Sequence, residues 1–232
     1  MKYTNGALEK YSKHFILSLF FIDQGTNVWM ESRGYVVGAT TTARLFNIGY
    51  GNVKTSVDKS KTIMKVGEGP YTYVSPAMKR GSLLEDEACD LFQEQMNLSK
   101  IYHCGMTANK EFYGIFGCSP DGIFKFMNQL HLIEIKCPWI KKDATKEDIS
   151  QFLNTYGYPE DKIKKQLIKF GKAMFDTTNK HEALRKATKV YKKSVHGKGV
   201  LPQHWLQMQH QFASTGKKYF EIFKFILIYI IL

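Results

Sequence analysis

The apolar residues change their spacing along the chain, and each spacing predicts a different kind of element. In residues 77–96 they recur at helical intervals, which predicts a helix with one buried face. Residues 111–139 are instead rich in Ile, Phe and Tyr around a Ser-Pro-Asp-Gly turn, which predicts three short strands. We place these strands at about 112–117, 122–127 and 131–137. Helical and strand patterns mixed in this way indicate an α/β fold.

The second half of the chain predicts mainly helices. Two amphipathic patterns, at 162–175 and 181–193, each predict a basic helix, and residues 204–216 predict one more. Nearer the N-terminus, small and hydroxyl side chains at 38–46 predict the start of a short helix. Residues 47–76 are rich in Gly, Ser, Thr and Pro and predict a loop.

Two strongly apolar runs raise the question of a membrane or an export signal. The run at 15–22 has only eight residues and lacks a small-residue cleavage site, so we expect a buried strand or helix there. The stretch at 219–232 is interrupted by Glu221 and Lys224, and the apolar part after Lys224 is far shorter than the ~20 residues of a membrane helix. We therefore expect a buried strand at this end and no membrane span.

The charge of the chain points to a polyanionic partner. Lys and Arg number 33 against 21 Asp and Glu, which gives a formal net charge of +12 over 232 residues. Residues 141–200 hold 15 of these basic residues and only 7 acidic ones. This Lys-rich helical stretch is either a solubilising face or a surface that follows phosphates, and a steep salt dependence of binding would indicate the second.

The four cysteines, at 89, 104, 118 and 137, lie far apart and contain no C-x-x-C pair. This spacing argues against zinc ribbons and against a disulfide-rich secreted protein. Small buried thiols in an intracellular protein are the simpler interpretation, and the sequence leaves nucleus and cytoplasm equally open.

The pattern that carries chemistry is Asp121 in the tight turn, followed by Glu134 and Lys136. Successive side chains of a strand alternate between its faces, so Glu134 and Lys136 project to one side and Ile133 and Ile135 to the core. If the three predicted strands form a meander, the turn and the third strand bring two carboxylates and an ammonium group together.

Such a group suits the hydrolysis of a phosphodiester. Carboxylate oxygens bind Mg²⁺, or Mn²⁺ in its place, and the metal lowers the pKa of a bound water and polarises the phosphoryl oxygen. The lysine holds the attacking water and offsets negative charge in the transition state. An exposed surface hairpin is the alternative interpretation, but the Ser-Pro-Asp-Gly turn and the Cys-Pro pair after Lys136 favour the catalytic one.

These motifs resemble those of the PD-(D/E)XK nucleases, and most closely the branch of YqaJ-like viral recombinases and phage lambda exonuclease. The similarity rests on S-P-D-G at 119–122 and E-I-K-C-P at 134–138, with further weak motifs in the same order over about 29–217. Those further matches are Trp29-x-x-x-Arg33 with Thr40, Gly81-x-x-x-Glu85, Glu111, and the glutamine-rich helix from Trp205 to Gln211.

The resemblance implies a role for each matching residue. Asp121, Glu134 and the main-chain carbonyl of Ile135 would bind the metal, and Lys136 would position the water. Glu85 would hold a second metal or a metal-bound water. The remaining implied residues are Gln207 as the ordering glutamine, with Gln209 and Gln211 as alternatives, and Arg33, Thr40 and Ser119 as contacts of the 5′ phosphate.

The resemblance also implies a fold, an activity and partners. We expect one nuclease domain over 1–232 with a restriction-endonuclease-like core, a central mixed sheet flanked by helices, and an insertion at about 141–200. The implied activity is Mg²⁺-dependent 5′→3′ digestion of linear double-stranded DNA in viral-type recombination or DNA end processing. The implied partners are DNA ends, a single-strand annealing protein and further copies of the chain in a trimeric ring. A structure-specific endonuclease and an inactive DNA-binding protein remain the alternatives.

Overall fold

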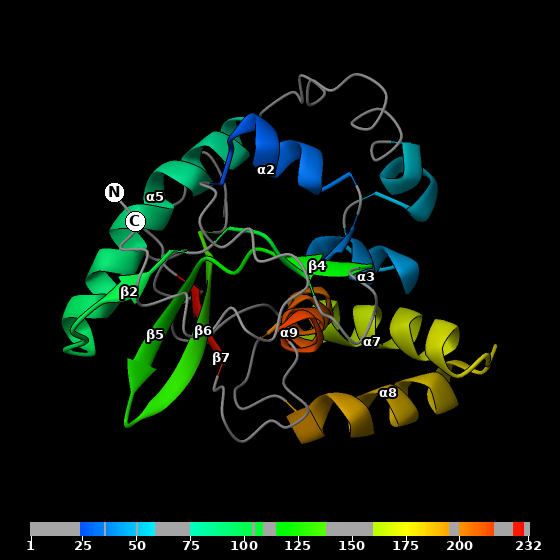
Figure 1. Ribbon diagram of the computed structural model, residues 1–232. Helices are drawn as coiled ribbons and strands as arrows, with labels where there is room; N and C mark the ends of the chain where they lie inside the picture. Colours follow the sequence, from blue (N-terminus) through cyan, green and yellow to red (C-terminus); the bar gives the residue numbers. More distant parts are fainter. Residues whose placement is uncertain are drawn as a thin grey trace. The chain divides into compact units, whose positions relative to one another are not determined.

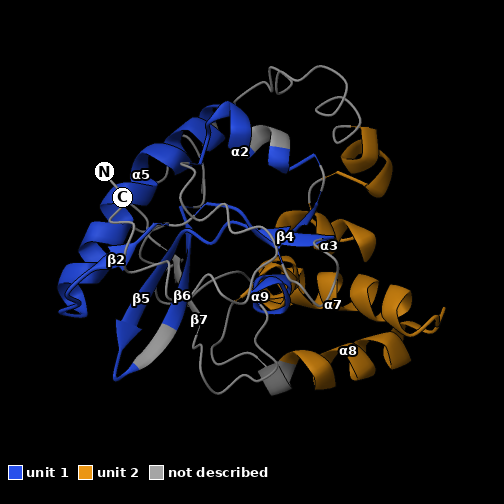
Figure 2. Cartoon of the chain, viewed as in Figure 1, with its two compact units in different colours: residues 1–38, 59–139, 210–232 blue, residues 39–58, 140–209 orange. Residues whose placement is uncertain are grey.

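The computed structural model describes most of the chain (Figure 1), and the chain forms two compact units (Figure 2). The first unit comprises Met1–Gly38, Lys59–Trp139 and His210–Leu232, and the second comprises Ala39–Asp58 and Ile140–Gln209. The residues described are 24–34, 36–49, 51–58, 75–103, 105–108, 115–137, 160–194, 200–215 and 225–229. The run at 15–22, Cys104 and Glu111 lie outside them. The single domain over 1–232 stays a prediction, and the predicted insertion at about 141–200 falls within the second unit.

The first unit contains two small mixed sheets. In the larger one, of order β2-β5-β6-β7, β5 is antiparallel to both β2 and β6, and β7 runs parallel to β6. In the smaller one, β4 lies between β1 and β3. The strands are β1 (Val37–Gly38), β2 (Ile101–Tyr102), β3 (Thr107–Ala108), β4 (Phe116–Cys118), β5 (Gly122–Phe126), β6 (Gln129–Lys136) and β7 (Phe225–Tyr229).

The predicted three-stranded meander is only half right. β5 and β6 form the expected hairpin, but β4 pairs with β1 and β3 in the other sheet. The break falls at the Ser-Pro-Asp-Gly turn, where Pro120 has no N–H to donate to a ladder. Gly122 then enters β5 in a space where a Cβ atom would lie 2.6 Å from Ile101 and 2.9 Å from Ile133. The turn therefore carries the chain from one sheet to the next.

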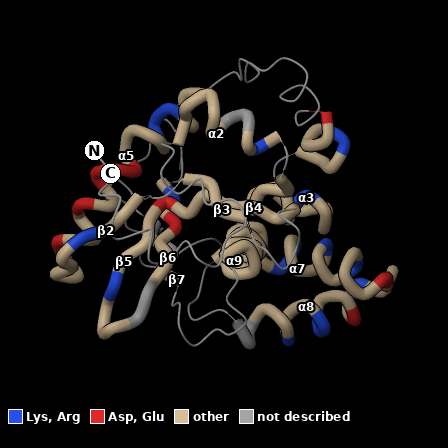
Figure 3. Tube along the Cα trace, viewed as in Figure 1, with Lys and Arg blue, Asp and Glu red and all other residues tan. Residues whose placement is uncertain are grey.

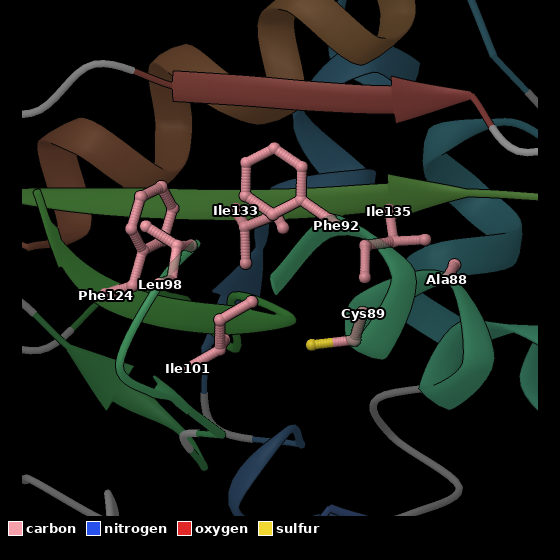
Figure 4. Packing of buried hydrophobic residues seen from close by; sticks show 8 residues of the cluster. All are labelled: Ala88, Cys89, Phe92, Leu98, Ile101, Phe124, Ile133 and Ile135. Carbon is pink, nitrogen blue, oxygen red and sulfur yellow. The ribbon is translucent and has the colours of Figure 1, made fainter. Parts of the chain in front are cut away.

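The core of the first unit lies between helix α5 (Pro76–Gln95) and the larger sheet (Figure 4). The helix begins after Ser75, whose hydroxyl oxygen accepts the backbone N–H of Met78 at 3.2 Å. Its buried side chains pack on alternate residues of β6, as predicted for Ile133 and Ile135. The cluster comprises Ala88, Cys89, Phe92, Leu98, Ile101, Phe124, Ile133 and Ile135. Glu134, between the two isoleucines, consequently projects to the opposite face of the sheet.

The second unit is helical among its described residues. It contains α3 (Ala39–Leu45), the hairpin of α7 (Glu160–Met174) and α8 (Lys180–Ser194), and the first part of α9 (Pro202–Ser214), close to the predicted positions. Residues 53–58 are also helical, although the sequence predicted a loop there. The cap explains the difference, because the Asn52 side chain accepts the backbone N–H of Thr55 at 2.8 Å.

The C-terminal apolar stretch contains the predicted strand. β7 adds to the larger sheet beside β6, with Glu134 opposite Leu227 and Lys136 opposite Tyr229 in the register. No helix within the described part of the chain is long and apolar enough to span a membrane.

Candidate active site

The β5–β6 hairpin brings Asp121 and Glu134 to one place in the fold. Gly122 lies opposite Ile133, so the turn that carries Asp121 sits beside the strand that carries Glu134. The Asp121 carboxylate oxygen Oδ2 accepts the backbone N–H of Ile135 at 2.5 Å. The convergence predicted from the meander therefore occurs through the hairpin alone.

Glu134 is the central acceptor of the site. Its side chain is only 2% exposed, and its two carboxylate oxygens accept from different groups. The Lys136 ammonium donates to Oε1, and the Gln211 amide Nε2 donates to Oε2 at 2.6 Å. Lys136 also donates to the carbonyl oxygen of Ile135 at 3.1 Å. A buried carboxylate with charged and amide donors keeps a fixed orientation.

Glu85 reaches this group from α5. It is half-buried and shares a side-chain hydrogen bond with Asp121. Burial raises the pKa of Glu85, and the nearby Glu134 raises it further against the opposing effect of Lys136. The three carboxylates predicted to act together thus come from α5, the turn and β6.

The charges of this group act on one another strongly. Burial, followed by the charge of Glu134, raises the pKa of Asp121 well above its ordinary value. Burial lowers the pKa of Lys136, but Glu134, Asp121 and Glu85 together raise it above the ordinary lysine value. Lys136 is therefore an ammonium group, and the negative charges of the neighbouring carboxylates disfavour one another's ionisation. A cation bound between the carboxylates would offset this repulsion.

The donor set fits a hard divalent cation. Mg²⁺ binds through one or two carboxylates and keeps several waters, and Asp121, Glu85 and Glu134 supply more than this minimum. In this structure Glu85 is hydrogen-bonded to Asp121, and Glu134 accepts from Lys136 and Gln211. No group of three or more His, Cys, Asp or Glu side chains that could hold a metal ion is found among the described residues. The assignment of Asp121, Glu134 and Glu85 to a metal therefore stays a prediction, and it requires their hydrogen bonds to rearrange.

Gln211, the predicted alternative, makes the glutamine contact that the structure describes. It lies one turn after Gln207 on α9, is 1% exposed and leaves its carbonyl oxygen Oε1 buried without a partner. Gln207 is also buried, at 8% exposure, but it belongs to the second unit. Sequence reasoning ranked Gln207 first by its place in the motif, and only the register of helix against strand distinguishes the two.

Helix α2 (Asn27–Ser32) and Gln24 before it are joined to the Ser-Pro-Asp-Gly turn. The indole Nε1–H of Trp29 donates to the hydroxyl oxygen of Ser119 at 2.9 Å, and Gln24 Nε2 donates to the Pro120 carbonyl at 3.3 Å. The Arg33 guanidinium carbon lies 4.5 Å from the centre of the Trp29 ring. Two of the predicted phosphate contacts, Arg33 and Ser119, are thus linked through Trp29.

Thr40, the third predicted phosphate contact, is exposed in the first turn of α3. It belongs to the second unit, so its place beside Arg33 stays a prediction.

His210 joins α9 to the smaller sheet, one residue before Gln211. Its ring Nε2 lies 3.0 Å from the Gly117 carbonyl oxygen, and the ring packs edge-on against Phe116 at 5.5 Å between centres. Burial lowers the pKa of His210 to about 4, although backbone hydrogen bonds to Gly117 and Val37 act in the opposite direction. The neutral imidazole therefore belongs to the folded state.

We expect His210 to make folding sensitive to acid. The unfolded chain takes up this proton near pH 6.5 and the folded chain only near pH 4, so the stabilisation is present above 6.5 and lost as the pH falls to about 4. Between pH 7 and 5 the loss is about 2 kcal/mol. Urea unfolding of wild type and His210→Gln at both pH values measures it, because other titrations are common to both proteins. Equal losses in the two proteins would contradict this role.

Comparisons with known proteins agree with the predicted family and fold. Residues 28–218 match the family model described as the YqaJ-like viral recombinase domain. Among solved structures, the chain is similar to "Crystal Structure of LHK-Exo in complex with dAMP", with a TM-score of 0.51 and 19% identity over 87% of this chain and 73% of that chain. A comparison with curated proteins found no match.

The fold is that of the PD-(D/E)XK nucleases, a mixed sheet with helices on its faces. Because the family model covers most of its length, the chain belongs to the YqaJ-like viral recombinase family. Membership of this family indicates a nuclease.

Proposed function

We propose that this protein is a Mg²⁺-dependent exonuclease that digests linear double-stranded DNA from the 5′ end. The observation that supports it best is the contact set of Asp121, Glu134 and Lys136 around the Ser-Pro-Asp-Gly turn. Lys136 donates to Glu134, and Asp121 accepts the backbone N–H of Ile135 between them, so two carboxylates and one ammonium group gather in a set suited to phosphodiester hydrolysis. Mn²⁺ would replace Mg²⁺ at the same oxygen ligands.

Each residue of the site has a defined task in this mechanism. Asp121, Glu134, Glu85 and the Ile135 carbonyl would hold the metal, which when bound supplies an acidified water and polarises the phosphate. The ammonium group of Lys136 would donate hydrogen bonds to the attacking water and to the phosphate oxygens on which negative charge develops. Gln211 holds Glu134 in its orientation from the opposite side.

Recognition of the DNA end would come from the α2 side of the site. Arg33 has the planar fork that binds phosphate oxygens in pairs, and Ser119 adds a hydroxyl next to Asp121. Thr40 would complete this set. A 5′ phosphate held beside the Ser-Pro-Asp-Gly turn would present the first phosphodiester to Asp121 and Glu134, which supports 5′→3′ polarity.

The biological setting is a further part of the proposal. Family membership supports a role in viral-type recombination or DNA end processing, inside a cell, with a single-strand annealing protein as partner. A trimeric ring around the DNA would keep the enzyme on its substrate between cleavage steps. The net charge of +12 favours a polyanionic substrate of this kind.

A digestion assay tests the activity and its direction. We expect a linear duplex with one labelled, 5′-phosphorylated strand to lose nucleotides progressively from that end with Mg²⁺, and to stay intact with EDTA. A duplex with 5′-hydroxyl ends is the matched substrate and should be degraded more slowly. Cleavage of covalently closed circles would instead identify an endonuclease, and binding without cleavage in Mg²⁺ an inactive DNA-binding protein.

A further inference from the structure

The hairpin of α7 and α8 is the most basic part of the second unit. Residues 160–191 contain nine Lys or Arg and four Asp or Glu, so at most four of the positive charges can be matched one to one. Figure 3 shows basic positions recurring along both helices. The catalytic residues of the first unit do not account for this charge.

The lysines of α7 are arranged in a row on its outer face. Leu167, Phe170 and Gly171 define the buried face, and the positions opposite them on a helix of 3.6 residues per turn are all lysine and all exposed. This α7 lysine row consists of Lys162, Lys165, Lys169 and Lys172. From Lys162 to Lys172 the row extends over ten residue steps, or about 15 Å of helix.

The hairpin holds the row on a rigid support. A Cβ atom at Gly171 would collide with the backbone carbonyl of Ala183, so the two helices pack with their backbones in close approach. Phe170 and Tyr191 each pack edge-on against Trp205, at 5.6 and 5.7 Å between ring centres. The outer face therefore keeps its orientation relative to the rest of this unit.

Helix stability does not explain the row. Lysines three and four residues apart repel one another, and Lys162 and Lys165 lie near the helix N-terminus, where the dipole disfavours positive charge. The ion pair of Lys165 with Asp161, at 3.6 Å, has both side chains at least 70% exposed and so contributes little. A polyanion bound along the row would offset this repulsion.

We propose that the α7 lysine row binds the phosphate backbone of duplex DNA, as a second contact in addition to the catalytic site. The proposal rests on the proposed function. Duplex DNA carries one phosphate per about 1.7 Å of its axis when both strands are counted, so about 15 Å of helix passes enough phosphates for each of the four lysines to reach one. Four such contacts are independent of base sequence and strengthen binding to any duplex.

The aromatic side chains favour duplex over single-stranded DNA. Proteins that bind single strands stack the bases on exposed aromatic rings. Within 160–191 the aromatic side chains are buried or half-buried, and Phe175 lies under the ammonium group of Lys186 at 5.5 Å. The row thus provides positive charge for the phosphate backbone of a duplex, and this hairpin has no exposed Phe, Tyr or Trp ring among residues 160–191 on which unpaired bases could stack.

The test measures duplex binding against salt with two variants of equal charge. In the row variant, all four row lysines become Gln; in the control variant, Lys54, Lys79, Lys100 and Lys125, all exposed and outside the hairpin, become Gln. Binding is measured in EDTA with a 5′-labelled duplex. We expect the slope of log affinity against log salt to become shallower by about 3 for the row variant, with at least a tenfold loss of affinity near 0.1 M salt. The control variant should change the slope by less than about 1.

Further measurements separate this proposal from the proposed function. A variant with all four row lysines changed to Arg should restore the slope, which a folding defect would not allow. Hydrolysis of a duplex end by the row variant at low salt would show that its catalytic site is intact. A wild-type protein that binds duplex DNA but does not cleave it would refute the proposed nuclease activity and leave the binding role of the row standing. Equal slopes for row and control variants, a change confined to single-stranded DNA, or a change confined to binding of phosphatidylserine vesicles would overturn the proposal.

Discussion

Replacement of Lys136 by Ala is expected to reduce DNA hydrolysis by about 10²–10³-fold while duplex binding is retained. Lys136 donates to both Glu134 and the Ile135 carbonyl, and the carboxylates around it raise its pKa, so its positive charge persists at any pH where the enzyme works. Without the ammonium group, the site loses the donor for the attacking water and for developing phosphate charge. Single-turnover digestion of a labelled duplex measures the loss directly.

The matched control is Lys125→Ala. Lys125 is exposed on β5 of the same hairpin, and its removal changes the net charge by the same amount. We expect hydrolysis within about threefold of wild type for this variant, and circular dichroism checks that both variants fold. Near-normal hydrolysis by a folded Lys136→Ala protein would show that another group carries out this step.

The site could be predicted from the sequence where it depends on local spacing. Alternation along one strand predicted that Glu134 and Lys136 project to one side and that Ile133 and Ile135 face the core. The structure confirms both predictions. Helical periodicity likewise predicted α5 and the burial of Ala88 and Phe92, although Leu83 of the same apolar pattern is 69% exposed. These features depend on residues close in sequence, for which strand and helix geometry leave few arrangements.

The parts that were missed depend on contacts distant in sequence. The assignment of β4 to the other sheet follows from its pairing with Val37 and Thr107, which no local pattern specifies. The choice between Gln207 and Gln211 depends on which turn of α9 faces β6, and both side chains are buried glutamines on one helix. The bond from Trp29 to Ser119 joins residues 90 positions apart, and no pattern in the sequence predicted it.

The Gln211 contact leads to the second expected result. Gln211→Leu keeps the size of the side chain but removes the donor to Glu134 Oε2, so this buried carboxylate loses its orientation from α9. We expect kcat to fall by about 10–100-fold, because groups that orient metal-binding carboxylates have effects of this size. The KM for DNA should stay within about threefold, since Gln211 is buried and does not face solvent.

Gln207→Leu is the matched control, because it makes the same change one turn earlier on α9 at a second buried position. Both variants lose a buried amide, so a purely structural effect would lower the thermal midpoint and the fraction of active enzyme in both. A positioning role predicts a kcat loss specific to Gln211→Leu, together with weaker Mg²⁺ activation. If Gln207→Leu shows the larger kcat loss, the motif position identified the working glutamine, and the bond from Gln211 serves the packing of α9 against β6.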